Sequence, residues 1–245
     1  MGIELENLTW EEAEKALVEH PVVVIPLGGR LKEHGLHLPL NNDWVLAEHL
    51  KNEVSKRLPV LIAPTISHSY YPAMVDYPGT VSLSVETAAA LIEEICTSLG
   101  RFGPRKFYIL NTGISTRRPL ERARQTLSAV GIELAYTDLD RILEPVAETL
   151  REQAGGSHAD EIETSMMLHI APDIVHLERA VPDFHGDGPG PLRRKQNPDQ
   201  TEAGVYSPTG AFGDPTLATV WKGEKLLTAL VQGILEDIRK LSPDP

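Results

Sequence analysis

Hydrophobic and polar positions along this chain follow two alternating periods. Short apolar runs predict strands at residues 22–26, 60–63, 106–110 and 132–136. Longer segments, with apolar residues three and four positions apart, predict helices at residues 44–58, 85–99, 119–130, 141–153, 161–170 and 216–241. Asp43 and Ser84 precede two of these helices, and both residue types commonly cap helix N-termini.

The order of these elements predicts the fold class. Strands that alternate with helices indicate an α/β fold with three layers, in which a mostly parallel sheet is covered by helices on both faces. Residues 182–215 are rich in Gly and Pro and predict a long loop. No change in composition divides the chain, so we expect residues 1–245 to form a single domain. Ligands of such sheets bind at the carboxyl ends of strands, where we expect the loops 28–43 and 111–116.

Composition narrows the range of partners. The 245 residues include 23 Lys and Arg against 35 Asp and Glu, a formal net charge of −12. This charge repels phosphate backbones and anionic membranes, so we expect neither nucleic acid nor a membrane as partner. The chain has one cysteine, Cys96, which lies in an apolar helical stretch and is expected to be a buried packing residue. A single cysteine excludes an intrachain disulfide, and we therefore expect a cytoplasmic location. We expect no signal peptide and no membrane span.

The loop after the first predicted strand carries the strongest chemical signal. Glycines end the strand, and Lys32, Glu33, His34, His37 and Asp43 follow within a dozen residues. Imidazole and carboxylate groups gathered at a strand end are what a divalent metal such as zinc requires, whereas a protonated lysine cannot be a ligand. A capping aspartate and a surface histidine are the alternative for a lone pair of such residues, but the clustering of histidines favours a metal.

A second cluster occupies residues 157–165. His158 precedes Glu161 and Glu163 at the start of a predicted helix. Glu161 in the first turn suits the helix dipole. Glu163 leads into an apolar segment, Met166–Leu168, so we expect its face of the helix to be buried. A buried carboxylate needs a metal, a cation or hydrogen-bond donors.

Both clusters resemble motifs of the creatininase family of cyclic-amide hydrolases, the creatinine amidohydrolases. The family's first motif, Glu-Gln-His-Gly-Pro-His-Leu-Pro followed by an Asp, is similar to residues 32–39, which read Lys-Glu-His-Gly-Leu-His-Leu-Pro and are followed by Asp43. Its third motif, His-Ala-Gly, two variable residues and Glu-Thr-Ser, is similar to residues 158–165. The likeness extends over nearly the whole chain. It implies a creatininase-like α/β fold, a metal-dependent amidohydrolase and a homo-oligomer, in this family a hexamer.

The resemblance also implies a ligand set. The family uses two metals bridged by its aspartate, which falls on Asp43, and further ligands fall on His34 and Glu163. Two ligands are missing, because the first-loop glutamate falls on Lys32 and the second-loop histidine falls on Gly113.

Both missing groups would serve the same metal. We therefore expect one divalent ion, Zn, Mn or Fe, in each subunit, with the ammonium of Lys32 in place of the second ion. Three protein ligands leave a position open for water.

The remaining roles follow from this arrangement. His158, the motif histidine, or His37 would give a proton to the leaving group, and Lys32 would stabilise an oxyanion or orient an anionic substrate. The residues expected to line the substrate site, with ordinary loop packing as the alternative, are Glu33, Trp44, Tyr70 and Ser115.

Three functional hypotheses result. The first is a metal-dependent hydrolase acting on a C–N bond of a small, possibly cyclic, amide. The second keeps the fold and hydrolyses a C–C bond next to a ketone, or a lactone. The third is a non-catalytic, small-molecule-binding scaffold, in which Lys32 neutralises Asp43 and Glu163 and no metal binds. The identity of the small-molecule substrate is not encoded in these motifs.

Overall fold

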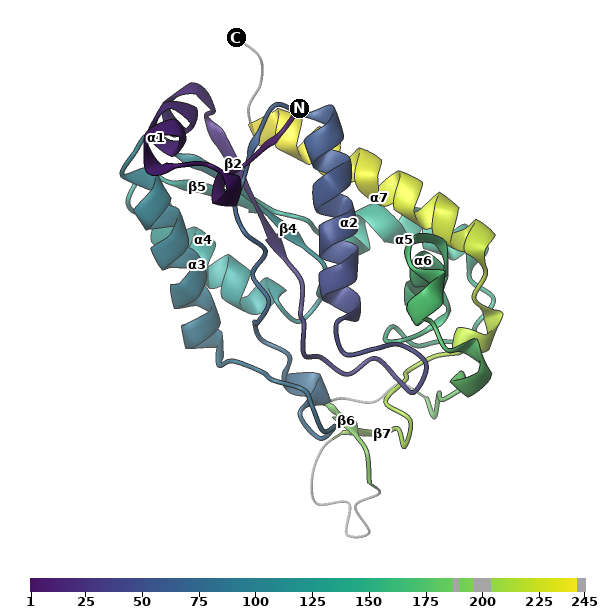
Figure 1. Cartoon of the computed structure of the whole chain (residues 1–245). Helices are drawn as coiled ribbons and strands as arrows, with labels where there is room; N and C mark the ends of the chain where they lie inside the picture. Colours follow the sequence, from purple (N-terminus) through teal and green to yellow (C-terminus); the bar gives the residue numbers. More distant parts are fainter. Residues whose placement is uncertain (187–189, 196–203, 242–245) are drawn as a thin grey trace.

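A five-stranded parallel sheet forms the centre of the computed structural model, which describes residues 1–186, 190–195 and 204–241 (Figure 1). The strands follow the order β1-β3-β2-β4-β5 across the sheet. Their bounds are β1 Ile3–Glu4, β2 Val22–Leu27, β3 Leu61–Ile62, β4 Lys106–Asn111 and β5 Glu133–Tyr136. Because β2 and β4 are neighbours in register, the loops that follow them leave the same edge of the sheet side by side.

Seven α-helices among the described residues cover the two faces of the sheet. They are α1 Trp10–Glu19, α2 Asn42–Arg57, α3 Val85–Gly100, α4 Arg117–Ser128, α5 Leu139–Leu150, α6 Glu161–Ile170 and α7 Val220–Leu241. Helices α1, α3 and α4 pack on one face, and α2, α5, α6 and α7 pack on the other (Figure 1). The predicted three-layer α/β fold is confirmed.

The pleat of the strands divides the core between these faces. Val22 and Val24 of β2 face α2 and α7, whereas Val23 and Ile25 face α3 and α4. Strand side chains point alternately to opposite faces, so a strand covered on both sides reads as an unbroken apolar run. Cys96 of α3 is fully buried, and burial raises the pKa of its thiol to about 12, which confirms its role as filler.

The structure tests the predicted helix ends. Asp43 does not cap a helix, because α2 begins at Asn42 and the carboxylate of Asp43 is committed to other partners. The predicted cap at Ser84 is confirmed, since its hydroxyl accepts from the amide of Thr87. The last helix begins at Val220, after a 3-10 turn, rather than at residue 216.

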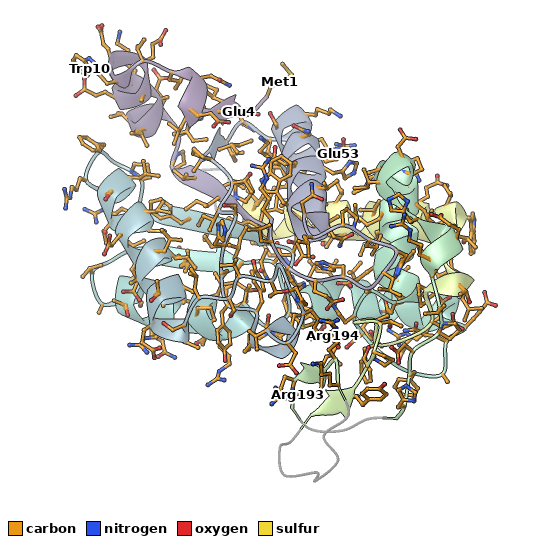
Figure 2. All side chains as sticks on the ribbon, turned by 60° about the horizontal axis from the view of Figure 1, so that its bottom comes forward. Met1, Glu4, Trp10, Glu53, Arg193 and Arg194 are labelled. Carbon is orange, nitrogen blue, oxygen red and sulfur yellow. The ribbon has the colours of Figure 1, made fainter. Side chains whose placement is uncertain are left out.

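The Gly/Pro-rich segment is not entirely loop. Two short parallel strands, β6 (Leu192–Arg193) and β7 (Val205–Tyr206), lie within residues 182–215. Parts of this predicted loop, 187–189 and 196–203, lie outside the described residues. Figure 2 shows Arg193 on this small sheet, where its guanidinium lies 3.0 Å from Asp76.

The hydrophobic pattern did not predict the amino-terminal helix α1. Only Ala16 and Leu17 of this helix are buried, so it offers a narrow apolar stripe. Trp10 stands away from the body of the protein and is 79% exposed (Figure 2). Within the described part of the chain, no helix combines the length and apolar character that crossing a bilayer requires.

Candidate metal and substrate site

A buried ionic triad lies where β2 ends. The Lys32 Nζ lies 2.8 Å from Asp43 Oδ2, and His34 Nε2 lies 2.7 Å from Asp43 Oδ1. Burial opposes each charge, but the ammonium and the carboxylate offset this penalty for one another. Their attraction keeps the pKa of Lys32 above its ordinary value and the pKa of Asp43 far below its own.

The close approach of α2 to β2 creates this triad. At Gly28, directly after the strand, an added Cβ would lie 2.3 Å from the carbonyl oxygen of Asp43. Only glycine permits this contact. The hydroxyl of Thr112, which follows β4, donates to the same carbonyl oxygen at 3.2 Å. The first turn of α2 is therefore held against the ends of both central strands, as the loop positions predicted.

The second cluster meets the first through His158. Its Nε2 lies 3.0 Å from the Glu33 carbonyl oxygen and 3.3 Å from Glu33 Oε2, while its Nδ1 lies 3.6 Å from Glu163 Oε2. Burial opposes the charge on this imidazole, but the carboxylates of Glu33 and Glu163 together raise the pKa of His158 above its ordinary value. Ala159 has a φ of 46°, unusual for a residue with a Cβ, and its amide donates to Glu163 Oε2 at 2.5 Å.

Three potential ligand atoms converge at this point. One atom each from His34, His158 and Glu163 lies within 4.8 Å of the others, the one such group among the described residues. Two imidazoles and a carboxylate suit Zn, Mn or Fe. Asp43, the bridging ligand of the sequence hypothesis, is outside this group and contacts it through His34.

The two glutamates of α6 differ from the prediction, which placed Glu163 rather than Glu161 on the buried face. Glu163 is partly exposed, with 23% of its side chain accessible, whereas Glu161 is fully buried. The carboxylate of Glu161 accepts from the Glu152 and Gln153 amides and pairs with the buried ammonium of Lys222 from α7. Nothing in the local pattern marks Lys222, because its partner lies 61 residues away in the chain.

An aromatic ring lies near both positions at which the family motif has a metal ligand and this chain does not. A Cβ at Gly113 would lie 3.8 Å from the ring of Tyr71, and Lys32 Nζ lies 5.6 Å from that ring's centroid. Tyr71 is buried. An ammonium near a ring at this distance gains from cation–π attraction. Sequence analysis did not indicate this contact.

His37 is poorly suited to donate a proton. Its Nε2 lies 2.8 Å from the Thr164 hydroxyl oxygen. Burial, with the nearby charge of His34, lowers the pKa of His37 to about 4. An imidazole with that pKa is neutral at pH 7, so the geometry favours His158 over His37 as the donor.

The four residues predicted to line the substrate site make separate contacts. Glu33 is buried against His158. Trp44 lies under the guanidinium of Arg30, 4.6 Å from the ring centroid. Ser115 donates to the Tyr70 carbonyl at 2.9 Å, and the Tyr70 hydroxyl accepts from Arg118.

A cavity of about 100 Å³ adjoins Glu163. Lys32, His34 and Asp43 are nearly inaccessible, whereas Glu163 is partly exposed and is the one of these four residues that lines the cavity. Its walls are formed by α2, α5 and α6 together with the loop after β4. The predicted residues Trp44, Tyr70 and Ser115 are not among those that line it.

The parallel sheet, with a buried ionic site at its carboxyl edge, defines an α/β protein with a candidate metal site. The profile of the family described as creatininase, creatinine amidohydrolase, matches residues 6–238, so the chain belongs to the creatininase family. It is 27% identical to creatinine amidohydrolase from Pseudomonas putida, over 97% of this chain and 96% of that one. It is 29% identical to mycofactocin precursor peptide peptidase from Mycobacterium tuberculosis, over 92% and 87%.

Solved structures agree with this assignment. A structure described as creatininase Mn superposes with a TM-score of 0.80, at 25% identity, over 100% of both chains. A mutant creatininase described as Zn-Zn type gives a TM-score of 0.81, also at 25% identity over both full chains. The predicted creatininase-like fold and family are therefore confirmed.

Proposed function

We propose that this protein is a hydrolase that cleaves a C–N bond of a small amide with one divalent metal ion. The observation that carries the proposal is the position of Lys32. Its ammonium lies at Asp43, in the position where the family motif has a metal-ligating glutamate, while His34 and Glu163 belong to the cluster of potential ligand atoms. Named relatives include an amidohydrolase and a peptidase, which both support amide cleavage.

The donor set fits a single ion. We assign His34, Asp43 and Glu163 as its ligands; His34 and Glu163 belong to the cluster of potential ligand atoms, whose third member is His158, and Asp43 adjoins that cluster through His34. When bound, such an ion would supply a water molecule of lowered pKa and a Lewis acid for the substrate carbonyl.

The protein's own residues account for the rest of the reaction. Lys32, kept charged by Asp43, would stabilise negative charge on the carbonyl oxygen. His158, whose raised pKa keeps a proton available, would give that proton to the leaving nitrogen. Burial of the triad excludes bulk water and strengthens both electrostatic contributions.

One observation favours the non-catalytic alternative. Both oxygens of Asp43 already have partners within the protein, Lys32 and His34, so the charge of this carboxylate is balanced without a metal. The two proposals differ in metal content. The alternative of C–C or lactone hydrolysis differs from amide cleavage in its products, because only amide cleavage releases ammonia or an amine.

Metal titration combined with product analysis tests the proposal. Chelator-treated protein would be titrated with Zn²⁺, Mn²⁺ and Fe²⁺, and then incubated with creatinine, hydantoin, a short peptide amide and a matched lactone. We expect one equivalent of metal, release of amine from an amide, and loss of both in His34→Ala but not in His169→Ala. Near-zero occupancy in excess metal, or one ion that survives His34→Ala, would overturn the proposal.

A further inference from the structure

The cavity beside Glu163 lies one helical turn beyond the two carboxylates of the site. Leu46 follows Asp43 by three residues on α2, and Met166 follows Glu163 by three residues on α6. Residues three apart are neighbours on one helix face. Leu46 and Met166 both line the cavity and are buried. A substrate carbonyl held near Glu163 would therefore have an apolar space within about one turn's length, ~5 Å.

Helix α5 closes this space from the opposite side. Leu139, Leu143 and Ala147 line the cavity at intervals of four residues, which places them in one stripe along the helix. Ala147 is 1% exposed, whereas Leu139 and Leu143 are only partly buried. The cavity thus has a closed apolar end at Ala147 and an open end toward solvent.

The charges around the cavity restrict what can enter. Asp160 and Glu163 line it as carboxylates, and Arg151, the one cation in the lining, forms two hydrogen bonds to Glu144 at 2.8 and 2.9 Å. Asp140 and Glu144 add two further carboxylates to the lining, and each of the four already has a partner within the protein. An anionic group would therefore meet an excess of carboxylates, with Arg151 already paired. A neutral aliphatic group would contact Leu46, Leu143 and Met166 instead.

We infer that this cavity is a specificity pocket for an aliphatic group of three or four carbons carried next to the scissile carbonyl of a neutral amide. The inference names a substrate class and rests on the proposed hydrolase function. The size follows from the volume: an apolar cavity of about 150 Å³ holds benzene, so about 100 Å³ accepts a somewhat smaller group. Each added methylene should bind roughly fourfold more tightly until the pocket is full.

Methionine methyl groups report on this pocket without any need for turnover. The chain has four methionines, and Met166 lines the cavity whereas Met74 lies on a separate 3-10 turn. Protein labelled with [¹³C]methyl-methionine would be titrated with acetamide, isobutyramide, pentanamide and octanamide. We expect saturable shifts of the Met166 signal, with affinity rising to pentanamide and falling at octanamide, and an unchanged Met74 signal.

Two variants should move the preferred chain length in opposite directions. Ala147→Leu fills the closed end and should weaken pentanamide binding at least tenfold while acetamide binding is retained. Leu143→Ala widens the pocket and should favour octanamide. Val146→Ala, on the same helix but outside the lining, is the matched control. If Ala147→Leu does not fold, Leu143→Ala alone tests the inference.

The outcomes separate this inference from the proposed function. No shift at Met166 with any amide, or an unchanged chain-length profile in Leu143→Ala, would overturn the specificity pocket. Metal titration of the same samples reports on the hydrolase proposal separately. Chain-length selectivity without any metal binding would support the pocket and overturn the hydrolase, whereas metal-dependent cleavage without selectivity would do the reverse.

Discussion

The ammonium nitrogen of Lys32 lies 2.8 Å from Asp43 Oδ2 in the interior of the protein. Both side chains are almost completely buried. An isolated charge at this depth would be very costly, so each group depends on the other for its ionised state. In the resemblance to the family motif, Lys32 stands where the motif has a glutamate. Its ammonium supplies the positive charge beside Asp43 that a metal would otherwise supply.

Restoring the two lost ligands should restore a second metal. We expect Lys32→Glu combined with Gly113→His to raise the metal content from one to two ions per chain, measured by elemental analysis after dialysis against Zn²⁺ or Mn²⁺. The backbone at Gly113 has no positive φ, and an added Cβ meets only side-chain atoms, the nearest being those of Thr116 at 3.3 Å, so the substitution requires a small shift of the Thr116 side chain. Two ions in the natural protein, or one in the double variant, would contradict the substitution of metal by ammonium.

Removing His158 should separate proton transfer from metal binding. In the proposed roles, His158→Ala keeps one metal equivalent but lowers kcat by roughly 10² to 10⁴ on a cleaved amide. Glu163→Gln should instead weaken metal binding, because Glu163 is a proposed ligand. Metal affinity by calorimetry and steady-state rates distinguish the two. Since the His158 imidazole lies in the same cluster of ligand atoms, loss of metal in His158→Ala would assign it as a ligand.

The buried pair of Lys222 and Glu161 should be needed for stability rather than for chemistry. Lys222→Met leaves Glu161 without its cation, and we expect the free energy of unfolding to fall by roughly 3–5 kcal/mol. The double variant Glu161→Gln with Lys222→Met should recover much of this loss. Lys225→Met, an exposed position on the same helix, should change stability by less than about 0.5 kcal/mol. Urea denaturation measures all three, and equal effects of Lys222→Met and Lys225→Met would refute the prediction.

Acid should destabilise the metal-free protein partly through His37. The folded pKa of His37, lowered to about 4 by burial, lies below its ordinary value of 6.5. The folded state therefore binds fewer protons in that window, and stability is lost as the pH falls from 6.5 to 4, by up to about 1.4 kcal/mol per pH unit. Asp160 acts in the opposite direction. Burial raises its pKa to about 6, so the folded state binds more protons and the stability that Asp160 contributes is lost as the pH rises toward 6.

The difference between the natural protein and His37→Gln isolates the histidine contribution. Glutamine is neutral and retains a polar atom for the Thr164 hydroxyl, which lies 2.8 Å from His37 Nε2. We expect a shallower pH dependence of the free energy of unfolding in His37→Gln between pH 4.5 and 6.5, measured by urea denaturation. An unchanged slope would show that the imidazole is not the group that titrates.

The elements could be predicted from sequence where their periodicity is local. Val22–Leu27 is an uninterrupted apolar run, and α6 occupies the predicted residues 161–170. Helix α1 was missed because only Ala16 and Leu17 are buried in it. The capping role of Asp43 was wrong because tertiary partners, Lys32 and His34, outcompete the helix terminus for its carboxylate.

In the candidate site, too, some features could be predicted from the sequence and others depend on tertiary contacts. The resemblance of residues 32–43 and 158–165 to the motifs of the family sufficed to recognise the family, and it implied roles for His34, Asp43, Glu163 and Lys32. Their assignment as ligands, like the single domain and the hexamer, stays a prediction. The partner of Glu161 could not be predicted, since Lys222 lies on another helix 61 residues away.

The sequence by itself determined the alternation of strands and helices and the three-layer architecture, because these depend on local periodicity. The resemblance of residues 32–39 to the family motif further predicted that Lys32 replaces a ligand. Only the tertiary structure decided that Lys32 pairs with Asp43, that His158 contacts Glu33, and that a partly apolar cavity adjoins Glu163. The physical reason is packing: α2 approaches β2 closely at Gly28, and α6 then meets α2 and α5, so groups far apart in the chain come within bonding distance.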